Sequence, residues 1–452
     1  MKIRLIQPAG FDQRLQLNSE PKFSIFSMAP PVTMPLLAAL TPQEVEVGVT
    51  DEELEIIDFE EDVDLVGVTA ITPHAPRAYE IAQKFRKRGV SVIMGGLHAS
   101  LLPHEAIKHV DSVLIGEAEN IWESIIDDFK RSSLKPFYHG TPAEMESMPR
   151  PRLDLLRRQG FIIPHATIAT RGCPFLCDFC VIKKVYGQGF RKRSVKEVIS
   201  EIAQAKSKII FFWDDNIAGD AHYLKELMRR LIPLKVYWGS QATVKFAEDD
   251  ELLKLAQKSG CGVIFMGFES ISGESLKHVK KSFNNLVDYG ELVKKMHDHG
   301  IHVAAGAVFG FEHDDKSIFE RTVEYLIKIN VDSVAFKILI PYPGTQTFEH
   351  FQKENRLIYN DFPRDWGRWS GDEVVFKPRL MSPEELFEGY LWAVKNFYST
   401  RSIFKRTLCG SQKNLRKRTL YKMFGNLLVN FDYKNKFLGE LLKKAGKASR
   451  VN

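Results

Sequence analysis

Short apolar strands alternate with amphipathic helices along most of this chain, and this alternation limits its fold more than any other feature. In the first 145 residues, strand patterns occur at "IRLIQP", "VEVGV", "DLVGVTAIT", "VSVIMGG" and "DSVLIGE". A helical pattern, "RAYEIAQKFRKRG", precedes the fourth of them and ends at Gly89. The alternation predicts βαβ units and a parallel sheet with helices on both faces. A sheet of this kind binds ligands beyond the carboxyl ends of its strands.

A second series of repeats follows a polar stretch with three prolines, "GTPAEMESMPRPRLDLL", which is typical of a linker. The strand candidates here are "HATIATRG", "IIFFWDD", "VYWGSQ", "GVIFMGFES", "HVAAGAVFGF" and "SVAFKILIPYPGT". Helical stretches such as "SVKEVISEIAQA" and "DDELLKLAQKSG" lie between them. Six such repeats predict a partial or full (β/α) barrel, with polar residues at the carboxyl ends of its strands. A helical region starts beyond roughly residue 370.

The 452 residues suffice for two or three domains, and their net charge of +6 is unevenly distributed. From Arg401 onward there are 14 Lys and Arg against 2 Asp and Glu, so this tail carries +12 and the preceding residues −6. Its basic residues alternate with Phe, Tyr and Leu, which favours contact with an anionic membrane surface, an acidic substrate or RNA. A solvated helical face is the alternative. No run approaches the ~18 apolar residues of a membrane span, and "MKIRLIQPAG" is typical of a first strand rather than a secretory signal.

Three of the five cysteines are crowded into "RGCPFLCDFC", at Cys173, Cys177 and Cys180, just after a predicted strand. Cys261 and Cys409 are isolated, so we expect no disulfide framework and a cytoplasmic protein. Thiolates at this density suit zinc or an iron–sulfur cluster. A structural zinc site needs four ligands, and no neighbouring His or Cys completes one. The pattern predicts a reactive metal site with an open position; a closed zinc site with a distant fourth ligand is the alternative.

This segment resembles the cluster-binding loop of radical S-adenosylmethionine (SAM) enzymes, which carries C-x₃-C-x₂-C with an aromatic residue before the last cysteine. The resemblance covers residues ~160 to 350 and implies a [4Fe–4S] cluster on Cys173, Cys177 and Cys180. Its fourth iron would bind the amino and carboxylate groups of SAM, and Phe179 would lie against the adenine. One-electron reduction, by an external flavodoxin-type or ferredoxin-type donor, would release a 5′-deoxyadenosyl radical that abstracts hydrogen from the substrate.

The resemblance also implies SAM contacts at the ends of the next barrel strands. Polar side chains and glycines stand there, namely Asp214, Asp215, Asn216, Ser240, Gln241, Glu269, Ser270, Gly306 and Gly310. The Asp214–Asn216 stretch would meet the methionine moiety, although Asp and Asn at this place are also typical of a helix N-cap. Glu269 and Ser270 would bind the ribose or the amino group, and the glycines would let the backbone approach the adenine.

The first series of strands resembles the cobalamin-binding, Rossmann-like domain that a large class of radical SAM enzymes carries. The loops "VTAITPHAP", "MGGLHAS" and "IGEAEN" supply the candidate contacts, namely Thr69, Ala70, Gly95, Gly96, His98, Gly116, Glu117 and Glu119. Glycines there admit a flat macrocycle, because a side chain would collide with it. Ordinary turn glycines are the alternative. The fold implied is α/β, with a Rossmann-like parallel sheet (1–145), a linker (146–165), a (β/α)₆ partial TIM barrel (166–370) and a helical, basic C-terminal region (371–452).

One loop departs from the pattern of many cobalamin domains, which carry Asp-x-His-x-x-Gly after the first strand. The corresponding segment is "AGFDQRLQ", with Arg14 where the cobalt-binding His would stand. His74 and His98 lie in other loops, where a hydrogen-bonding role is the simpler interpretation. The departure argues against a histidine ligand to cobalt of the ordinary kind.

The resemblance implies a cobalamin-dependent radical SAM enzyme, most simply a C-methyltransferase acting on an unactivated carbon. Cob(I)alamin would take a methyl group from one SAM, and a second SAM would be cleaved at the cluster to activate the substrate. A cyclase, an epimerase or an oxidative rearrangement enzyme with the same cofactors is the alternative. Its substrate would be a small molecule, a lipid or a peptide, and the basic tail favours a lipid or membrane-associated one. The sequence identifies no catalytic acid or base.

Two other functions conflict with the sequence. Methylthiolation of tRNA would need a second cluster on three further cysteines of the N-terminal domain, and residues 1–160 contain none. We therefore expect no nucleic-acid partner. A binding module without activity would require the cysteine loop to be vestigial, although its spacing is intact.

Overall fold

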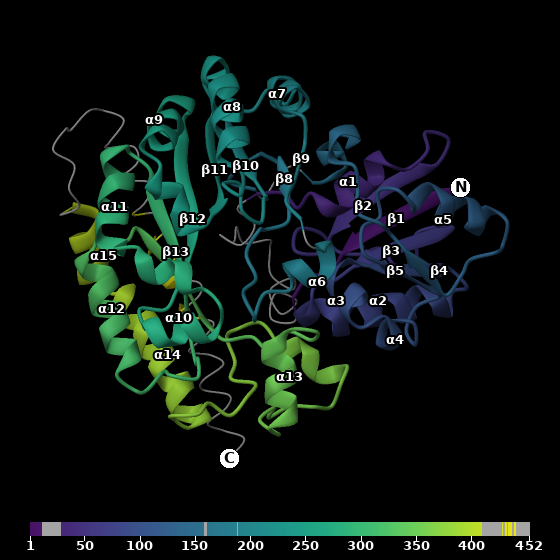
Figure 1. The fold of residues 1–452 in the computed structure, drawn as a ribbon. Coiled ribbons are helices and arrows are strands. Elements are labelled where there is room, and N and C mark those ends of the chain that lie inside the picture. Colours follow the sequence, from purple (N-terminus) through teal and green to yellow (C-terminus); the bar gives the residue numbers. More distant parts are fainter. Residues whose placement is uncertain are drawn as a thin grey trace.

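The computed structural model describes residues 1–10, 29–157, 161–187 and 189–408, with residues 427, 430, 431, 433–435, 438 and 439 of the C-terminal segment. Arg14, Cys409 and most of the basic tail lie outside the described residues. Two six-stranded parallel sheets carry the described chain (Figure 1). This arrangement confirms the predicted fold class, whereas the predicted domain boundaries stay predictions.

The first sheet has the strand order β2-β1-β3-β4-β5-β6. Its strands are β1 (Lys2–Gln7), β2 (Glu46–Asp51), β3 (Leu65–Thr69), β4 (Ser91–Gly95), β5 (Ser112–Ile115) and β6 (Phe137–His139), with helices α1 (Thr33–Ala39), α2 (Ala75–Lys87), α3 (Gly96–Leu101), α4 (Pro103–Ala106) and α5 (Trp122–Lys130). Ile81 and Phe85 of α2 pack on one face of the sheet, and Trp122 and Ile126 of α5 pack on the other. Both faces are therefore covered, as a buried parallel sheet requires.

The second sheet keeps its strands in sequence order, β7-β10-β11-β12-β13-β14, and β7 and β14 form its two edges. The strands are β7 (His165–Thr167), β10 (Ile209–Phe212), β11 (Tyr237–Ala242), β12 (Cys261–Glu269), β13 (His302–Phe309) and β14 (Ser333–Ile338). The helices that follow them include α7 (Val195–Gln204), α8 (Ala221–Leu231), α9 (Asp250–Ser259), α10 (Gly273–His278), α11 (Tyr289–Asp298), α12 (Ile318–Lys328) and α13 (Gln346–Lys353). This is a partial barrel, and the carboxyl ends of its strands form one rim.

A two-stranded antiparallel ribbon, β8 (Thr170–Arg171) with β9 (Arg191–Lys192), was absent from the sequence prediction. The chain between its strands holds the three clustered cysteines and the short helix α6 (Ile182–Tyr186). Each strand has two residues, which is too short for an alternating pattern to be recognised. The ribbon closes the cysteine segment into a loop with two adjacent stems.

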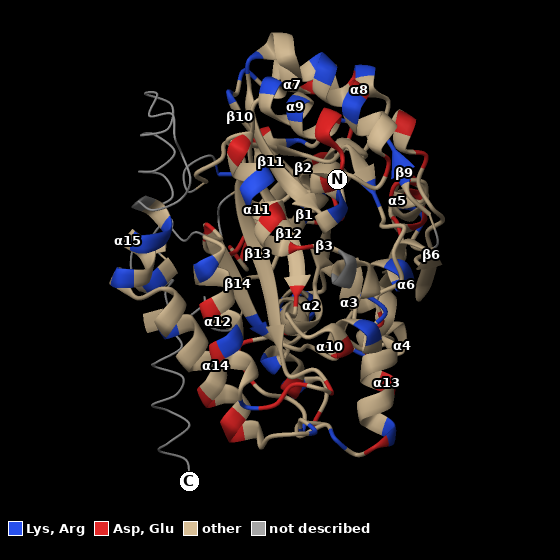
Figure 2. Cartoon of the chain, turned by 60° about the vertical axis from the view of Figure 1, so that its left-hand side comes forward, with Lys and Arg blue, Asp and Glu red and all other residues tan. Residues whose placement is uncertain are grey.

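The described part of the C-terminal region is helical, as predicted, with α14 (Pro383–Phe397) and α15 (Thr400–Leu408). Ser382 and Glu385 form a capping box at the start of α14. The hydroxyl of Tyr398 donates to the carbonyl of Val334 at 2.7 Å and so fastens this region to β14. Basic residues mark α15 in Figure 2. Among the described residues, no helix is both long and apolar enough to cross a lipid bilayer.

Candidate active site

The loop between β8 and α6 holds Cys173, Cys177 and Cys180, all three partly buried and free of disulfides. Burial raises the pKa of the Cys177 thiol to about 12 and that of Cys180 to about 11. The thiols interact electrostatically with one another, and the ammonium of Lys281 opposes the effect of burial at each of them. They therefore form one cluster of donors beside a fixed positive charge.

The donor chemistry of this cluster suits an iron–sulfur group. Within the described ranges, no three His, Cys, Asp or Glu side chains surround a point where a single metal ion would bind. Three thiols from one short loop match the ligands that iron–sulfur clusters use. The residues present therefore fit the cluster that the sequence pattern implies, and Cys173, Cys177 and Cys180 would hold it.

Lys281, which no sequence pattern indicated, pairs with Glu269 at 2.6 Å between Nζ and Oε1. Glu269 ends β12 with a positive φ of 62°, a backbone conformation that residues other than glycine rarely adopt. The pair packs against Gly267, where an added Cβ would lie 2.7 Å from Lys281 Nζ. Because 12 residues separate its members in the sequence, only the fold brings this pair to the thiols.

The acidic stretch after β10 holds the stem of the cysteine loop. Asp214 is fully buried and accepts hydrogen bonds from the Ala169 N–H at 3.2 Å and from the backbone and hydroxyl of Thr170. Asp215 accepts from the Gly172 N–H at 2.8 Å. Burial raises the pKa of Asp214 to about 7. These contacts position backbone near the cysteines.

The N-cap interpretation of the same stretch is wrong. Helix α8 begins at Ala221, and its cap is Asp220, whose side chain accepts from the Tyr223 N–H at 3.0 Å. Asn216 instead accepts from the Thr243 N–H at 3.2 Å and points its amide at Cys173 Sγ, 3.9 Å away. It therefore joins the end of β11 to the cysteine loop.

The remaining predicted SAM contacts lie at the ends of the barrel strands. Ser240 is fully buried and donates to the carbonyl of Phe212 at 3.0 Å, and the Gln241 carbonyl accepts from the Ile217 N–H at 2.9 Å. Ser270 accepts from the Ser272 N–H at 3.0 Å. Their contacts with SAM stay predictions.

Aromatic rings stand beside the other predicted adenine contacts. An added Cβ on Gly306 would lie 3.1 Å from the ring of Phe265. The ring of Phe179 lies 6.2 Å from that of Phe311, between centroids. Gly310 has a φ of 98°, which favours glycine. The roles of these residues toward SAM also stay predictions.

A cavity of about 470 Å³ lies between the carboxyl ends of the first sheet and the ribbon that carries the cysteine loop. The first sheet and its loops contribute Thr69, Ala70, Gly95, Gly96, Gly116, Glu117 and Glu119 to its lining. The chain beyond residue 160 contributes Ile168, Thr170, Arg171, Tyr186, Trp213 and Asp215. Every residue predicted to contact cobalamin except His98 lines this cavity. Of the residues predicted to contact SAM, Asp215 lines the same cavity, so the structure places the predicted cobalamin contacts beside the stem of the cysteine loop.

His98 is not among the residues that line this cavity. Its ring is fully buried, 2.9 Å from the hydroxyl of Tyr79 and 3.1 Å from Glu105. The indole of Trp366 donates to the same glutamate at 3.0 Å. This hydrogen-bonding role agrees with the simpler interpretation of the sequence.

Gly95 and Gly96, at the β4–α3 junction, line the cavity without side chains, and this pair is called its floor. Gly96 has a φ of 89°, and an added Cβ would collide with the hydroxyl of Thr69 and approach the N–H of Ala70 to 3.0 Å. Only glycine fits here without displacing β3. A floor without side chains suits a flat macrocycle, so the residues present fit the predicted cobalamin, and Thr69, Gly95, Gly96 and Gly116 would hold it.

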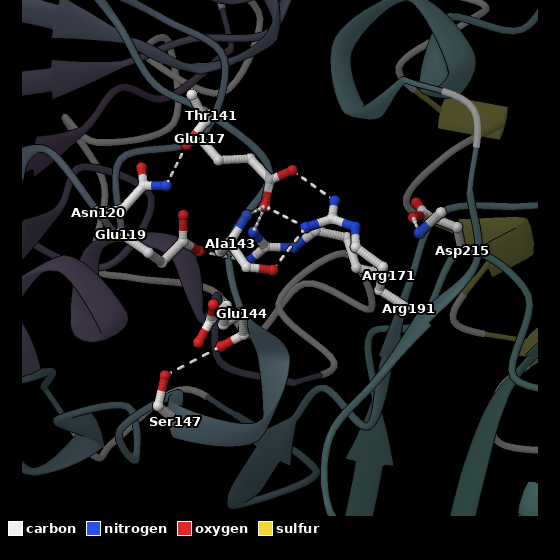
Figure 3. Close-up of polar contacts among 11 residues, drawn as sticks. Glu117, Glu119, Asn120, Thr141, Ala143, Glu144, Ser147, Arg171, Arg191 and Asp215 are labelled. Carbon is white, nitrogen blue, oxygen red and sulfur yellow. Dashed lines mark hydrogen bonds and ion pairs between the residues drawn. The ribbon is translucent and has the colours of Figure 1, made fainter.

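Charged side chains join the two halves at the edge of this cavity (Figure 3). The carboxylate of Glu117 pairs with both Arg171 and Arg191, and Glu119 pairs with Arg171 at 2.6 Å. Burial opposes the ionisation of Glu117, but the two guanidiniums keep its pKa below the ordinary value. The sequence placed Glu117 at the cofactor and indicated neither arginine, because Arg171 precedes the cysteine spacing that defines the motif and Arg191 belongs to no motif.

Family models match both halves of the chain. Residues 28–126 match the B12 binding domain, and residues 167–326 match the Radical SAM superfamily. Bacteriochlorophyllide d C-12(1)-methyltransferase of Chlorobaculum tepidum is 30% identical over 394 residues, covering 83% of this chain and 84% of the relative. The chain belongs to the B12-binding radical SAM enzymes.

Two further relatives and one solved structure are similar to this chain. Bacteriochlorophyllide d C-8(2)-methyltransferase of the same organism is 30% identical over 84% of this chain and 87% of its own. Anaerobic magnesium-protoporphyrin IX monomethyl ester cyclase of Cereibacter sphaeroides is 22% identical over 75% of this chain and 61% of its own. The fold matches the radical SAM methyltransferase TsrM of Kitasatospora setae, solved with cobalamin and a [4Fe-4S] cluster, with a TM-score of 0.63, 16% identity and coverage of 95% and 99%.

Proposed function

We propose that this B12-binding radical SAM enzyme is a C-methyltransferase that acts on an unactivated carbon. The observation that carries the proposal is the single cavity that the glycine-rich strand ends and the stem of the cysteine loop share. Chemistry that needs two cofactors at one carbon depends on such positioning. The relatives at 30% identity, which cover most of the chain, are methyltransferases by name.

The proposal places a [4Fe–4S] cluster on Cys173, Cys177 and Cys180, SAM at the barrel rim, and cobalamin over the floor at Gly96. When bound, these groups supply one-electron reduction, hydrogen-atom abstraction and a transferable methyl group. Contacts of Phe179, Asp214, Ser240, Gln241, Glu269, Ser270 and Gly306 with SAM belong to the same proposal.

The chain's own residues position the cysteine loop, favour thiolates in it and line the cavity with apolar side chains. Asp214 and Asp215 fix the backbone that leads into the cysteine loop. The Lys281 ammonium favours the thiolate form of Cys177 and Cys180, which is the form that ligates metal. Apolar side chains such as Leu36 and Ile93 line the inner wall of the cavity, which suits an unactivated carbon.

The test is transfer of a deuterated methyl group. The chain is reconstituted anaerobically with iron, sulfide and cobalamin, reduced, and supplied with methyl-deuterated SAM and a candidate substrate. Bacteriochlorophyllides are the first class to assay, because both 30% identical relatives are named for them. We expect the deuterated methyl group in the product and none with Cys177→Ser.

A cyclase or another rearrangement enzyme is the second candidate, favoured by the cyclase relative. The same assay separates the two functions. A substrate consumed with formation of 5′-deoxyadenosine, but without deuterium in its product, would contradict methyl transfer and support the rearrangement.

The proposal includes two partners, an external one-electron donor of the flavodoxin or ferredoxin type and an anionic membrane surface for the basic tail. Arg406 is buried and donates to the carbonyls of Val331 and Asp332, so a truncation that tests the tail must leave α15 intact. Ending the chain after residue 408 should reduce flotation with anionic liposomes. Unchanged association would contradict the membrane contact.

A further inference from the structure

The carboxylate of Glu117 forms an ion pair with an arginine on each stem of the cysteine loop. One guanidinium that it binds, Arg171, stands two residues before Cys173, and the other, Arg191, belongs to the returning strand β9. The two arginines are directly opposite each other in the β8–β9 ribbon. Everything between them, including all three cysteines, forms the loop that this ribbon closes.

Glu117 itself belongs to the other half of the molecule, two residues beyond the end of β5. A second carboxylate from the same turn, Glu119, binds Arg171 at 2.6 Å. The Ala143 N–H donates to Glu117 at 3.2 Å, and its carbonyl accepts from Arg191 at 2.9 Å. The carboxyl edge of the first sheet is therefore fastened to both stems of the loop.

The four charged side chains of this network are paired and largely shielded from solvent. Their exposed fractions are 4% for Glu117, 13% for Glu119, 11% for Arg171 and 21% for Arg191. Removing one member of a buried ion pair is costly, because the remaining charge loses its partner in a medium of low polarity. The charges of these two carboxylates and two guanidiniums sum to zero.

We propose that Glu117 is a positioning residue that sets the placement of the cluster loop against the corrinoid-binding sheet and neutralises the field of Arg171 and Arg191 at the cluster. It acts through the two arginines and contacts neither cofactor. The inference rests on the proposed function for the identity of the cofactors, and it assigns to Glu117 a role other than the cobalamin contact that its sequence position suggested.

The proposal predicts opposite effects for opposite charges. Glu117→Gln leaves an excess positive charge near the cluster, which stabilises the reduced, more negative cluster. Arg191→Gln leaves an excess negative charge and stabilises the oxidised cluster. The double variant restores neutrality. A merely structural role would not reverse sign between the two single variants.

The experiment is a potentiometric titration of the reconstituted cluster, monitored by electron paramagnetic resonance, in the full-length chain. At the wild-type midpoint potential, we expect the ratio of reduced to oxidised cluster to rise about threefold in Glu117→Gln and to fall about threefold in Arg191→Gln. The double variant should match the wild type. Glu123→Gln, an exposed carboxylate on α5, is the matched control and should change nothing.

A second measurement tests whether Glu117 fixes the position of the cysteine loop. Hydrogen exchange of the cofactor-free chain should become faster in residues 170–193 for Glu117→Gln and should stay unchanged for Glu123→Gln. Shifts of the same sign in both single variants, or an unchanged potential, would overturn the proposal, as would unchanged exchange. If Glu117→Gln fails to fold, Arg191→Gln alone still decides the sign. Neither readout needs methyl transfer, so a chain that transfers no methyl group contradicts the proposed function and leaves this result readable.

Discussion

At the scale of single residues, Lys281 is a positive charge that acts on all three thiols. Burial opposes its charge, but Glu269 and Cys177 raise the pKa of Lys281 above its ordinary value. It therefore stays protonated in the folded chain. Its ammonium lowers the pKa of each neighbouring thiol against the effect of burial.

Replacing Lys281 with Met should make the thiols less reactive in the cofactor-free chain. Loss of the positive charge raises the pKa of Cys177 and Cys180, so less thiolate is present at pH 8. We expect alkylation by iodoacetamide at these two cysteines to slow about threefold or more. Lys280→Met, whose exposed side chain binds Asp178 and Gln346, is the control. Equal rates in the wild type and Lys281→Met would contradict the role.

A second single-residue prediction concerns Gly96→Ala and the binding of cobalamin. An alanine there would be strained by a φ of 89° and would collide with Thr69, which should cost about 1–2 kcal/mol of stability. It should also weaken cobalamin binding by about tenfold or more, since the floor must move.

The control for Gly96→Ala is Gly89→Ala, which has a φ of 80° and no atom within 4 Å of an added Cβ. It should lose similar stability but keep its affinity for cobalamin, measured by spectrophotometric titration. Equal affinities in the two variants would show that the β4–α3 junction does not form the cofactor floor.

At the scale of elements, the barrel is held together at the end opposite its rim. The buried carboxylate of Asp332, just before β14, lies 2.8 Å from His297 at the end of α11 and 3.0 Å from His302 at the start of β13. Burial opposes its ionisation, but the two histidines hold the pKa of Asp332 well below its usual range. Burial alone would lower the pKa of His297, but the charge of Asp332 raises it, and the pKa of His297 lies above its ordinary value. Groups at this end of a barrel serve stability rather than catalysis.

These shifts fix the pH range in which the contact stabilises the fold. The depressed pKa of Asp332 contributes above its unfolded value of ~3.9, and the contribution is lost as the pH falls toward the folded value. The raised pKa of His297 contributes below ~6.5 and is lost as the pH rises through the folded value. The stabilisation is therefore largest between about pH 4 and pH 6.5.

Asp332→Asn should lower the free energy of unfolding by about 3 kcal/mol at pH 5.5, because a buried pair loses one partner. The loss should be smaller at pH 8.5. Urea denaturation at both pH values measures it. Asp250→Asn, which breaks an exposed ion pair with Lys295, should cost less than about 1 kcal/mol. A loss for Asp332→Asn that does not depend on pH would contradict the assignment.

At the scale of the whole molecule, the sequence was sufficient for the fold class and for the part of the site that has local patterns. Alternating strands and helices predicted both parallel sheets, and the cysteine spacing predicted the metal loop. Residues that act across the fold left no such pattern. Lys281 reaches Glu269 only through the turn after α10, and Arg191 reaches Glu117 only because a two-residue strand returns beside β8. A side chain with a partner 74 positions away has no periodicity to reveal it.

At the scale of the site, the carboxyl ends of the first sheet meet those of β7 and β10 at one cavity, whose lining includes the β8 stem of the thiol loop and the glycine floor. We infer that this arrangement serves an iron–sulfur cluster and a corrinoid together. Their loading should be separable, because different elements hold them.

The most direct test is the iron and cobalt content of the anaerobically reconstituted chain and of a variant with Cys173, Cys177 and Cys180 all replaced by Ser. We expect about four iron atoms and about one cobalt per wild-type chain. The variant should lose nearly all iron and keep its cobalt. A wild-type chain that retains no cobalt, that binds zinc in place of iron, or whose iron survives the cysteine replacements would contradict the account.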